Sequence, residues 1–151
     1  MSEPQFEQIK LENQLCFPLY ACSREVIKRY RPFLDEIGLT YTQYVAMIVF
    51  WEEDSISVKE LGRRLHLDSG TLTPVLKSLE QKGYITRRRS TEDERVLIAA
   101  LTPEGRSLEH AAAGIPQQIC GCLRMQPEDV RQLRGLLSRL LSAIESETER
   151  K

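Results

Sequence analysis

The sequence has no long apolar run, only two histidines, and almost no net charge. No stretch is apolar for long enough to span a membrane, and residues 1–10 contain no apolar segment of the kind that directs secretion. We therefore expect a cytoplasmic protein of one domain, whose thiols stay reduced. The formal net charge is −1 over 151 residues, so overall basicity does not indicate a nucleic-acid partner.

The four cysteines do not follow a metal-binding pattern. The C-x₅-C spacing of Cys16 and Cys22 and the C-x-C spacing of Cys120 and Cys122 match no common zinc site. We expect no metal and no cofactor. Cys120 and Cys122 are too close along a helix to reach disulfide geometry with each other. Cys22 is roughly 240° around a helix from Cys16, so we interpret it as a packing residue.

The charge is distributed unevenly along the chain. Residues 57–95 contain nine Lys/Arg and six Asp/Glu, a net of +3, whereas the remaining residues contain 12 and 16, a net of −4. DNA binding depends on local positive charge rather than on the total. The region 57–95 is therefore the candidate for a DNA contact.

Two short helices are predicted at the start of this region. Ser57 and Glu60 form an S-x-x-E capping box. Asp68 is a favourable N-cap for a second helix, and Gly83 lies where a helix commonly ends. The second helix has an apolar stripe of Leu72, Val75, Leu76 and Leu79. Its opposite face has small hydrogen-bond donors and one cation, as entry into a major groove requires: Ser69, Thr71, Thr73 and Lys77.

A basic β-hairpin is predicted after the two helices. Residues 84–89 are β-branched, aromatic and basic, residues 90–94 form a polar turn, and residues 95–101 form the return strand. Arg87, Arg88 and Arg89 alone would suggest an edge strand protected from aggregation by its charges. After a capped helix pair, they favour DNA contact. Residues 57–102 are thus predicted to be a winged helix-turn-helix.

Helices are predicted on both sides, so the fold expected for residues 1–151 is mainly α with a small β-wing. Residues 1–10 are expected to be a loose arm. Residues 11–38 are expected to be mostly helical, with Pro18 and Pro32 starting, kinking or breaking the helix. Thr40 and Gln43 form a second capping box, which opens a helix over residues 41–53.

The helices after the hairpin, within residues 103–148, are predicted from proline and leucine positions. One helix starts at Pro103 and runs to about residue 124, with a bend at Pro116. The last helix starts at Pro127. Its apolar seam is longer than one small core needs, which indicates packing against a second copy of the chain. The seam consists of Val130, Leu133, Leu136, Leu137, Leu140, Leu141 and Ile144.

This order of elements, with Asp93-Glu94-Arg95 in the wing and Leu101-Thr102 before the next helix, resembles the MarR family. Two further strings are similar to the organic-hydroperoxide-sensing subgroup, OhrR. They are N-Q-L-C-F at residues 13–17 and L-D-S-G-T-L-T-P at residues 67–74. The resemblance covers nearly the whole chain from residue 11. It implies a repressor, not an enzyme, that binds a palindromic DNA operator as a homodimer and is released by organic hydroperoxide.

The resemblance also implies roles for individual residues. Cys16 matches the peroxide-reactive cysteine, and Tyr30 and Tyr41 match the tyrosines that hydrogen-bond its sulfur. Asp93 and Arg95 match a wing-tip pair whose arginine enters the minor groove. The groove-facing helix contains Asp68, Ser69, Thr71 and Lys77. Pro18 departs from the residue expected in the family and puts the geometry around Cys16 in doubt.

The spacing of Cys16 and Tyr30 limits how they can meet. Fourteen residues of straight helix separate them by ~21 Å. Contact requires either a sharp break at Pro18 or, as we prefer, Tyr30 and Tyr41 supplied by a partner subunit. A phenol can donate to a thiolate and stabilise it without adding charge. Without the resemblance, Cys16 would be interpreted as a small buried hydrophobe and the tyrosines as residues at the edge of the core.

Oxidation of Cys16 is expected to give a sulfenic acid first. Cys120 or Cys122 could then resolve it as an intersubunit disulfide, or a small cellular thiol could do so. Three other functions stay open from the sequence. The first is a MarR-type repressor that responds to a small aromatic ligand, with Cys16 not the sensor. The others are a thiol peroxidase, for which no His or Arg lies beside Cys16 in the sequence, and an architectural DNA binder.

Overall fold

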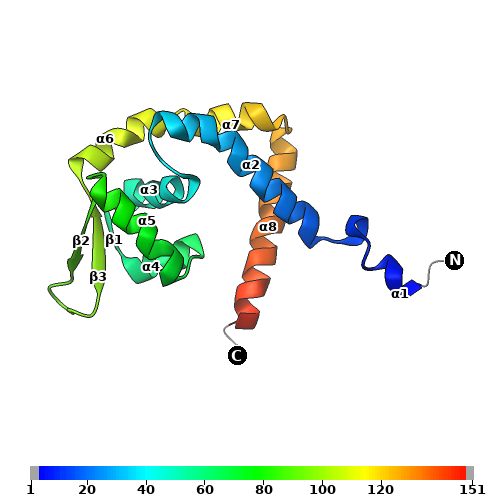
Figure 1. The fold of residues 1–151 in the computed structure, drawn as a ribbon, viewed down its shortest axis with the longest axis horizontal. Coiled ribbons are helices and arrows are strands. Elements are labelled where there is room, and N and C mark those ends of the chain that lie inside the picture. The colour runs from blue at the N-terminus through cyan, green and yellow to red at the C-terminus, as the bar shows by residue number, and fades with distance from the viewer. Residues whose placement is uncertain (1–3, 149–151) are drawn as a thin grey trace. The chain divides into compact units, whose positions relative to one another are not determined.

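The computed structural model describes residues 4–148, which form two compact units (Figure 1). The first unit extends to Ile115 and the second begins at Pro116. The first contains α1 (Pro4–Glu7), the 3-10 helix η1 (Leu11–Asn13), α2 (Cys16–Glu36), α3 (Tyr41–Glu53), β1 (Ser55–Ser57), α4 (Val58–Leu65), α5 (Ser69–Gln81), β2 (Ile85–Arg89), β3 (Leu97–Leu101) and α6 (Pro103–Ala112). The second contains α8 (Pro127–Thr148) and all of α7 (Ile115–Leu123) except Ile115. The predicted mainly helical fold with a small sheet is confirmed, and the expectation of one domain stays a prediction.

Helix α3 provides the centre of the core in the first unit. The predicted capping box is present, because the Thr40 side chain accepts from the Gln43 N–H and the Gln43 side chain accepts from the Thr40 N–H. Met47 and Phe50 of α3 are fully buried, and α3 contacts α4, α5, α6 and the sheet. Burial of each large apolar side chain contributes about 1.5–3 kcal/mol. The other elements supply Leu61, Leu72, Leu76, Leu79, Ile85 and Ala99 to this core.

The predicted helix-turn-helix consists of α4 and α5. The Ser57 hydroxyl accepts from the Glu60 N–H at 3.1 Å, which is half of the predicted capping box. The Glu60 carboxylate instead binds the guanidinium of Arg63. Asp68 Oδ1 accepts from the Thr71 N–H at 2.8 Å, which confirms the N-cap of α5. Gly83 follows α5 with a φ of +78°, a conformation that favours glycine.

The sheet has three antiparallel strands in the order β1-β3-β2. Strands β2 and β3 form the predicted hairpin, with Ile85 opposite Leu101. The return strand begins at residue 97 rather than 95, because residues 93–95 belong to the wing loop. Strand β1, which was not predicted, pairs Ser55 with Ala100. Three residues are too few to show the alternation by which a strand is detected in a sequence.

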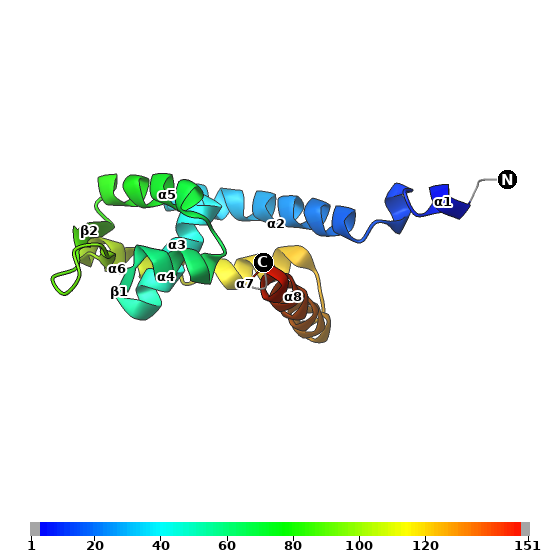
Figure 2. The same ribbon diagram turned by 90° about the horizontal axis from the view of Figure 1, so that it is seen from below.

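Helix α2 runs without interruption from Cys16 to Glu36. Pro18 lies in its first turn, where the missing N–H has no intrahelical partner to lose. The helix therefore starts near Pro18, one of the expected outcomes, and continues through Pro32. Figure 2 shows α2 extending in one straight line beyond α3 and α5. The expected loose arm is wrong at residues 4–7, which form α1, while residues 1–3 lie outside the described residues.

The segment after the sheet is divided into more helices than predicted. Helix α6 ends at Ala112 and α7 begins at Ile115, so the break precedes Pro116 and falls at residues 113–114. Helix α8 begins at Pro127 as predicted, and all seven side chains of its apolar seam are exposed. Among the described residues, no helix combines the length and the apolar character needed to cross a membrane.

A close backbone contact joins α6 to the residues around it. The Trp51 indole N–H donates to the Gly105 carbonyl oxygen at 2.9 Å, and the Gly105 N–H donates to Thr102 Oγ1 at 3.0 Å. A Cβ atom at Gly105 would lie 2.2 Å from the Tyr84 carbonyl oxygen and 2.7 Å from Leu101 Cδ1. A backbone carbonyl cannot rotate away as a side chain can, so only glycine fits at position 105.

We therefore expect Gly105→Ala to lower the free energy of unfolding by about 1–3 kcal/mol through steric overlap. Urea denaturation at one fixed protein concentration measures this change. Gly135→Ala is the matched control, since a Cβ there meets nothing within 4 Å. It should leave stability unchanged or raise it by up to about 1 kcal/mol through helix propensity. An equal loss in both variants would show that the contact with Tyr84 is not the cause.

Candidate functional site

Helix α5 and its N-cap residue present polar side chains to solvent. The residues predicted to face a groove are exposed, namely Asp68, Ser69, Thr71, Thr73 and Lys77. Thr73 Oγ1 donates to the Ser69 carbonyl oxygen at 2.7 Å, so its hydroxyl proton is already used. Hydrogen bonds from Thr71, the backbone N–H first, lower the pKa of the Asp68 carboxyl. The first turn of α5 offers hydroxyls and backbone N–H groups, and Lys77 adds an ammonium group further along the helix, a combination that suits an anionic partner.

The wing loop positions one arginine at its tip. Arg95 Nε and Nη2 donate to the two carboxylate oxygens of Asp93 at 3.0 and 3.1 Å, and the Arg95 backbone N–H donates to Asp93 Oδ1 at 3.0 Å. The side-chain bonds to Arg95 lower the pKa of Asp93. The Arg95 side chain is nevertheless 90% exposed. The predicted pair is thus brought together, with the arginine oriented by its own loop and open to solvent.

Arg87 differs from the other two arginines of β2. Its Nε and Nη2 donate to Glu80 Oε2 at 3.2 and 2.9 Å, and its backbone N–H donates to Glu80 Oε1 at 3.0 Å. The guanidinium lowers the pKa of Glu80. These bonds tie the wing to α5, and DNA contact by Arg87 stays a prediction beside that structural role. Arg88 and Arg89 are exposed. Glu80 was missed because in the sequence it looks like an ordinary exposed helix residue.

Cys16 is the first residue of α2 and is exposed. The interpretation of Cys16 as a small buried hydrophobe is therefore wrong for the single chain. Because α2 is unbroken up to Glu36, Cys16 and Tyr30 are held ~21 Å apart along it, and the alternative of a sharp break at Pro18 is also wrong. The large apolar side chains nearest to Cys16 in the chain, Leu15 and Phe17, are exposed as well.

The predicted tyrosines lie together at the other end of α2. The ring centroids of Tyr30 and Tyr41 are 5.0 Å apart, and that of Tyr44 is 5.8 Å from Tyr30. Burial raises the pKa of the Tyr41 hydroxyl and, with a smaller effect of Tyr41, that of Tyr44. Both phenols therefore stay protonated, and able to donate a hydrogen bond, at neutral pH. Tyr44 was not predicted as a site residue, although its i, i+3 spacing from Tyr41 places the two on one helix face.

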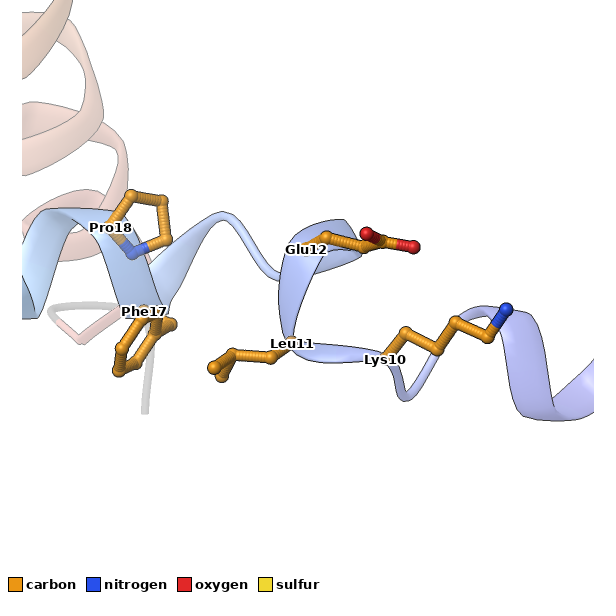
Figure 3. Close-up of a pocket in the computed structure, with 5 residues that line it drawn as sticks. All are labelled: Lys10, Leu11, Glu12, Phe17 and Pro18. Atoms are coloured by element: carbon orange, nitrogen blue, oxygen red, sulfur yellow. The ribbon is translucent and has the colours of Figure 1, made fainter.

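An open pocket of about 690 Å³ lies next to Cys16 in the chain (Figure 3). It is lined by Lys10, Leu11, Glu12, Phe17 and Pro18. The side chains of Leu11 and Phe17 point toward one another across it, whereas those of Lys10 and Glu12 point away from Phe17 (Figure 3). Cys16 is not among the lining residues, although Phe17 follows it directly in the sequence.

The remaining cysteines are free and exposed. Cys22 is therefore not a core packing residue of this chain, contrary to the sequence interpretation. Cys120 and Cys122 belong to the second unit, and a resolving role for either stays a prediction. Within residues 4–148, no three His, Cys, Asp or Glu side chains are grouped so as to hold a metal ion.

Comparison with known proteins gives relatives along nearly the whole chain. Residues 28–111 match the model of the family described as "Transcriptional regulator SarA/Rot". The "Organic hydroperoxide resistance transcriptional regulator" of Bacillus subtilis (strain 168) is 49% identical over 142 residues, which cover 94% of this chain and 97% of that protein.

Solved structures of AbfR, a protein of Staphylococcus epidermidis, are also similar. "Structure of reduced AbfR bound to DNA" has a TM-score of 0.78 at 36% identity, and covers 93% of this chain and 96% of the other. "Structure of Disulfide formed AbfR" has a TM-score of 0.63 at 38% identity, with coverages of 91% and 96%.

The Asp68 cap predicts a pH dependence of stability. Asp68→Ala removes the acceptor of the Thr71 N–H and should be less stable than wild type. The folded-state pKa of Asp68 is lowered. Its carboxylate therefore stabilises the fold above the unfolded pKa of about 3.9, and this contribution is lost as pH falls through the folded value. Urea denaturation between about pH 6 and about pH 2 should show the gap between the two proteins narrowing. Asp68→Asn, an uncharged cap, is the control, and a gap that stays constant across this range contradicts the assignment.

Proposed function

Because this chain belongs to the MarR family of transcriptional regulators, in its organic-hydroperoxide-sensing OhrR subgroup, we propose that it is a redox-controlled repressor. In this proposal it acts in the cytoplasm, binds palindromic double-stranded DNA as a homodimer, and leaves the DNA when organic hydroperoxide oxidises Cys16. The observation that carries the proposal is the exposed thiol of Cys16 in a chain 49% identical to a hydroperoxide resistance regulator. Its relatives are transcriptional regulators, so the chain is not an enzyme.

The proposed DNA contact uses two grooves. Helix α5, the recognition helix, enters the major groove with Ser69, Thr71 and Lys77. The exposed Arg95 enters the adjacent minor groove, whose negative potential attracts a guanidinium. The exposed Arg88 and Arg89 are close enough in sequence to the wing tip to meet phosphates. The solved DNA complex of AbfR, a protein similar to this chain, supports a DNA partner.

The proposed occupant of the apolar seam on α8 is a second copy of this chain. The seam runs from Val130 to Ile144, and every one of its large apolar side chains is exposed. A row of leucines at spacings of three and four is the pattern by which helices pair across a two-fold axis. In the first unit, large apolar side chains near the start of α2 are exposed too, and the proposed partner would cover them separately: Leu15, Phe17, Leu19 and Tyr20.

A second copy also completes the sensor. Cys16 cannot reach Tyr30 along its own unbroken α2, so the proposed donors to its sulfur are Tyr30 of the partner subunit and Tyr41 of the partner subunit. The thiolate attacks the terminal peroxide oxygen, an S–O bond forms, the O–O bond breaks, and an alkoxide leaves and takes up a proton. The product is a sulfenic acid and an alcohol.

The sulfenic acid then condenses with a second thiol to form a disulfide and water. The proposed thiol is Cys120 or Cys122 of the partner subunit, or else a small cellular thiol. Loss of the phenol contacts shifts the two protomers, and the half-site spacing no longer fits the operator. Structures of AbfR, a protein similar to this chain, in a reduced, DNA-bound form and in a disulfide form support a redox-dependent change of state.

The wing assignment predicts that Arg95→Ala binds operator DNA roughly 5- to 150-fold more weakly, the effect of losing one groove contact. The assay is fluorescence anisotropy at fixed salt on a duplex that the wild-type protein selects from random DNA. Arg139→Ala removes the same charge from the face of α8 opposite the apolar seam, and should bind as wild type does. Both variants should stay dimeric in sedimentation. Equal affinity of Arg95→Ala and wild type would contradict the wing assignment.

The sensor assignment predicts that Cys16→Ser binds the same duplex within about twofold of wild type and stays bound when cumene hydroperoxide releases the wild type. The serine hydroxyl replaces the thiol sterically but is not oxidised by peroxide. Cys22→Ser, which changes the other exposed thiol of α2, should respond as wild type does. Release of Cys16→Ser by the hydroperoxide would overturn the proposal. A regulator that responds only to an aromatic ligand would either release both proteins, if cumene hydroperoxide occupied its ligand site, or release neither of them.

The same samples on non-reducing gels test the resolving thiol. A covalent dimer that forms in wild type, and is lost in Cys16→Ser and in either Cys120→Ser or Cys122→Ser, identifies an intersubunit disulfide. Release from DNA without such a dimer assigns resolution to a small thiol.

A further inference from the structure

One buried polar side chain belongs to the same turn of α3 as two tyrosines of the cluster. Gln43 lies in the first turn of α3, between Tyr41 and Tyr44 in the sequence. It is 7% exposed. Polar groups in such positions are costly unless their hydrogen bonds are satisfied, because the surroundings have a low dielectric. The hydrogen bonds of Gln43 therefore constrain the position of α3 relative to α5.

Gln43 connects three segments of the first unit. Its Oε1 accepts from the Thr40 N–H at 3.1 Å and from Lys82 Nζ at 3.1 Å, which uses both acceptor positions of that oxygen. Its Nε2 donates to Ser78 Oγ at 3.0 Å. Lys82 Nζ also donates to the carbonyl oxygen of Gly38. Ser78 lies in the last turns of α5 and Lys82 is its C-cap.

These bonds join the tyrosine cluster to the recognition helix by a short route. Gly38 and Thr40 form the connection between α2, which carries Tyr30, and α3, which carries Tyr41. The rings of Tyr30 and Tyr41 are in contact, at 5.0 Å between centroids. Any movement of these rings that shifts the α2–α3 connection must therefore either break the bonds to Lys82 and Gln43 or move the C-terminal end of α5 with it.

A cluster held together only by apolar packing would tolerate small slides, whereas hydrogen bonds with a buried amide fix direction and distance. The α3–α5 interface has both, since Leu72, Leu76 and Leu79 supply the packing. The amide is thus not needed to bury surface. Its position suits a link that transmits a displacement between two elements.

We propose that Gln43, together with Lys82, is a positioning residue that transmits rearrangement of the Tyr30–Tyr41 pair to the recognition helix α5. This inference rests on the proposed redox function. In the reduced protein the link holds α5 in the orientation that binds DNA. After Cys16 is oxidised and its phenol contacts are lost, the displaced α2–α3 connection pulls on the end of α5 through these bonds. Neither residue touches the sulfur or the DNA in this scheme.

The test compares the loss of affinity on oxidation, not the affinity itself. Full-length wild type, Gln43→Leu and Lys82→Met are titrated on the selected duplex at fixed salt, before and after cumene hydroperoxide. The ratio of oxidised to reduced Kd in each variant should fall by roughly 2- to 30-fold below the wild-type ratio, the range for residues that modulate coupling between sites. The double variant should lose no more than the larger single effect, because both residues act in one link.

Two matched controls and one chemical readout exclude simpler roles. Gln81→Leu and Lys28→Met make the same changes at exposed positions of α5 and α2, and should keep the wild-type ratio. Loss of Cys16 alkylation with time of hydroperoxide treatment should proceed at the wild-type rate in every variant. A slower oxidation in Gln43→Leu or Lys82→Met overturns the link, because the residue would then act on the thiol.

The remaining outcomes separate this inference from the function on which it rests. If wild type, Gln43→Leu and Lys82→Met all lose affinity by the same factor, the link is wrong and the redox repressor stands. If hydroperoxide leaves the affinity of wild type unchanged, the redox repressor fails and the link fails with it. Should Gln43→Leu not fold, the exposed position of Lys82 still allows Lys82→Met to decide.

Discussion

An unbroken α2 is the constraint on which the proposed sensing mechanism depends. The helix begins at Cys16 and ends at Glu36, so the thiol and the tyrosine cluster are at opposite ends of a rigid rod. One chain alone cannot assemble the proposed sensor. Two antiparallel copies can, because each rod then brings its thiol toward the tyrosines of the other. In the proposed mechanism, oxidation of Cys16 therefore acts at the subunit interface rather than within one chain.

The same constraint explains why so much apolar surface is left open in the single chain. The seam on α8 and the side chains around Leu15 and Phe17 have no core of their own to enter. By contrast, the buried side chains of α3 pack against other elements of the first unit. The chain thus separates two tasks. The elements around α3 fold on internal contacts, and the terminal helices keep surface for a partner.

The sequence predicted those features that depend on neighbouring residues. Thr40, Asp68 and Gly83 mark helix ends through bonds or backbone angles that involve only residues close in the chain. Features that depend on distant pairing were missed or misplaced. Strand β1 exists because β3 accepts it as a neighbour, and Glu80 acquires its role only when the wing folds back onto α5.

In the candidate site, too, contacts between residues close in the sequence were predicted and contacts between distant residues were not. Arg95 and Asp93 are adjacent enough for a sequence motif to report their pairing, and the structure brings them together. The role of Gln43 was predicted only in part. Its capping bonds with Thr40 are local and were expected, whereas its bonds to Ser78 and Lys82 cross from one helix to another. Assigning Cys16 required a resemblance to a family, because reactivity of a thiol depends on surroundings that neighbouring residues do not reveal.

The bonds between Arg87 and Glu80 have a consequence for operator architecture. They fasten the first strand of the wing to the recognition helix through both backbone and side chain. The two parts of a protomer that are proposed to read DNA are consequently held to one another by these bonds. In the proposed complex, the number of base pairs between the step read in the minor groove and the bases read in the major groove is set by the protein within each half-site. Natural operators could then differ in length only in the spacer between the two half-sites, and only as far as the flexibility of the dimer allows.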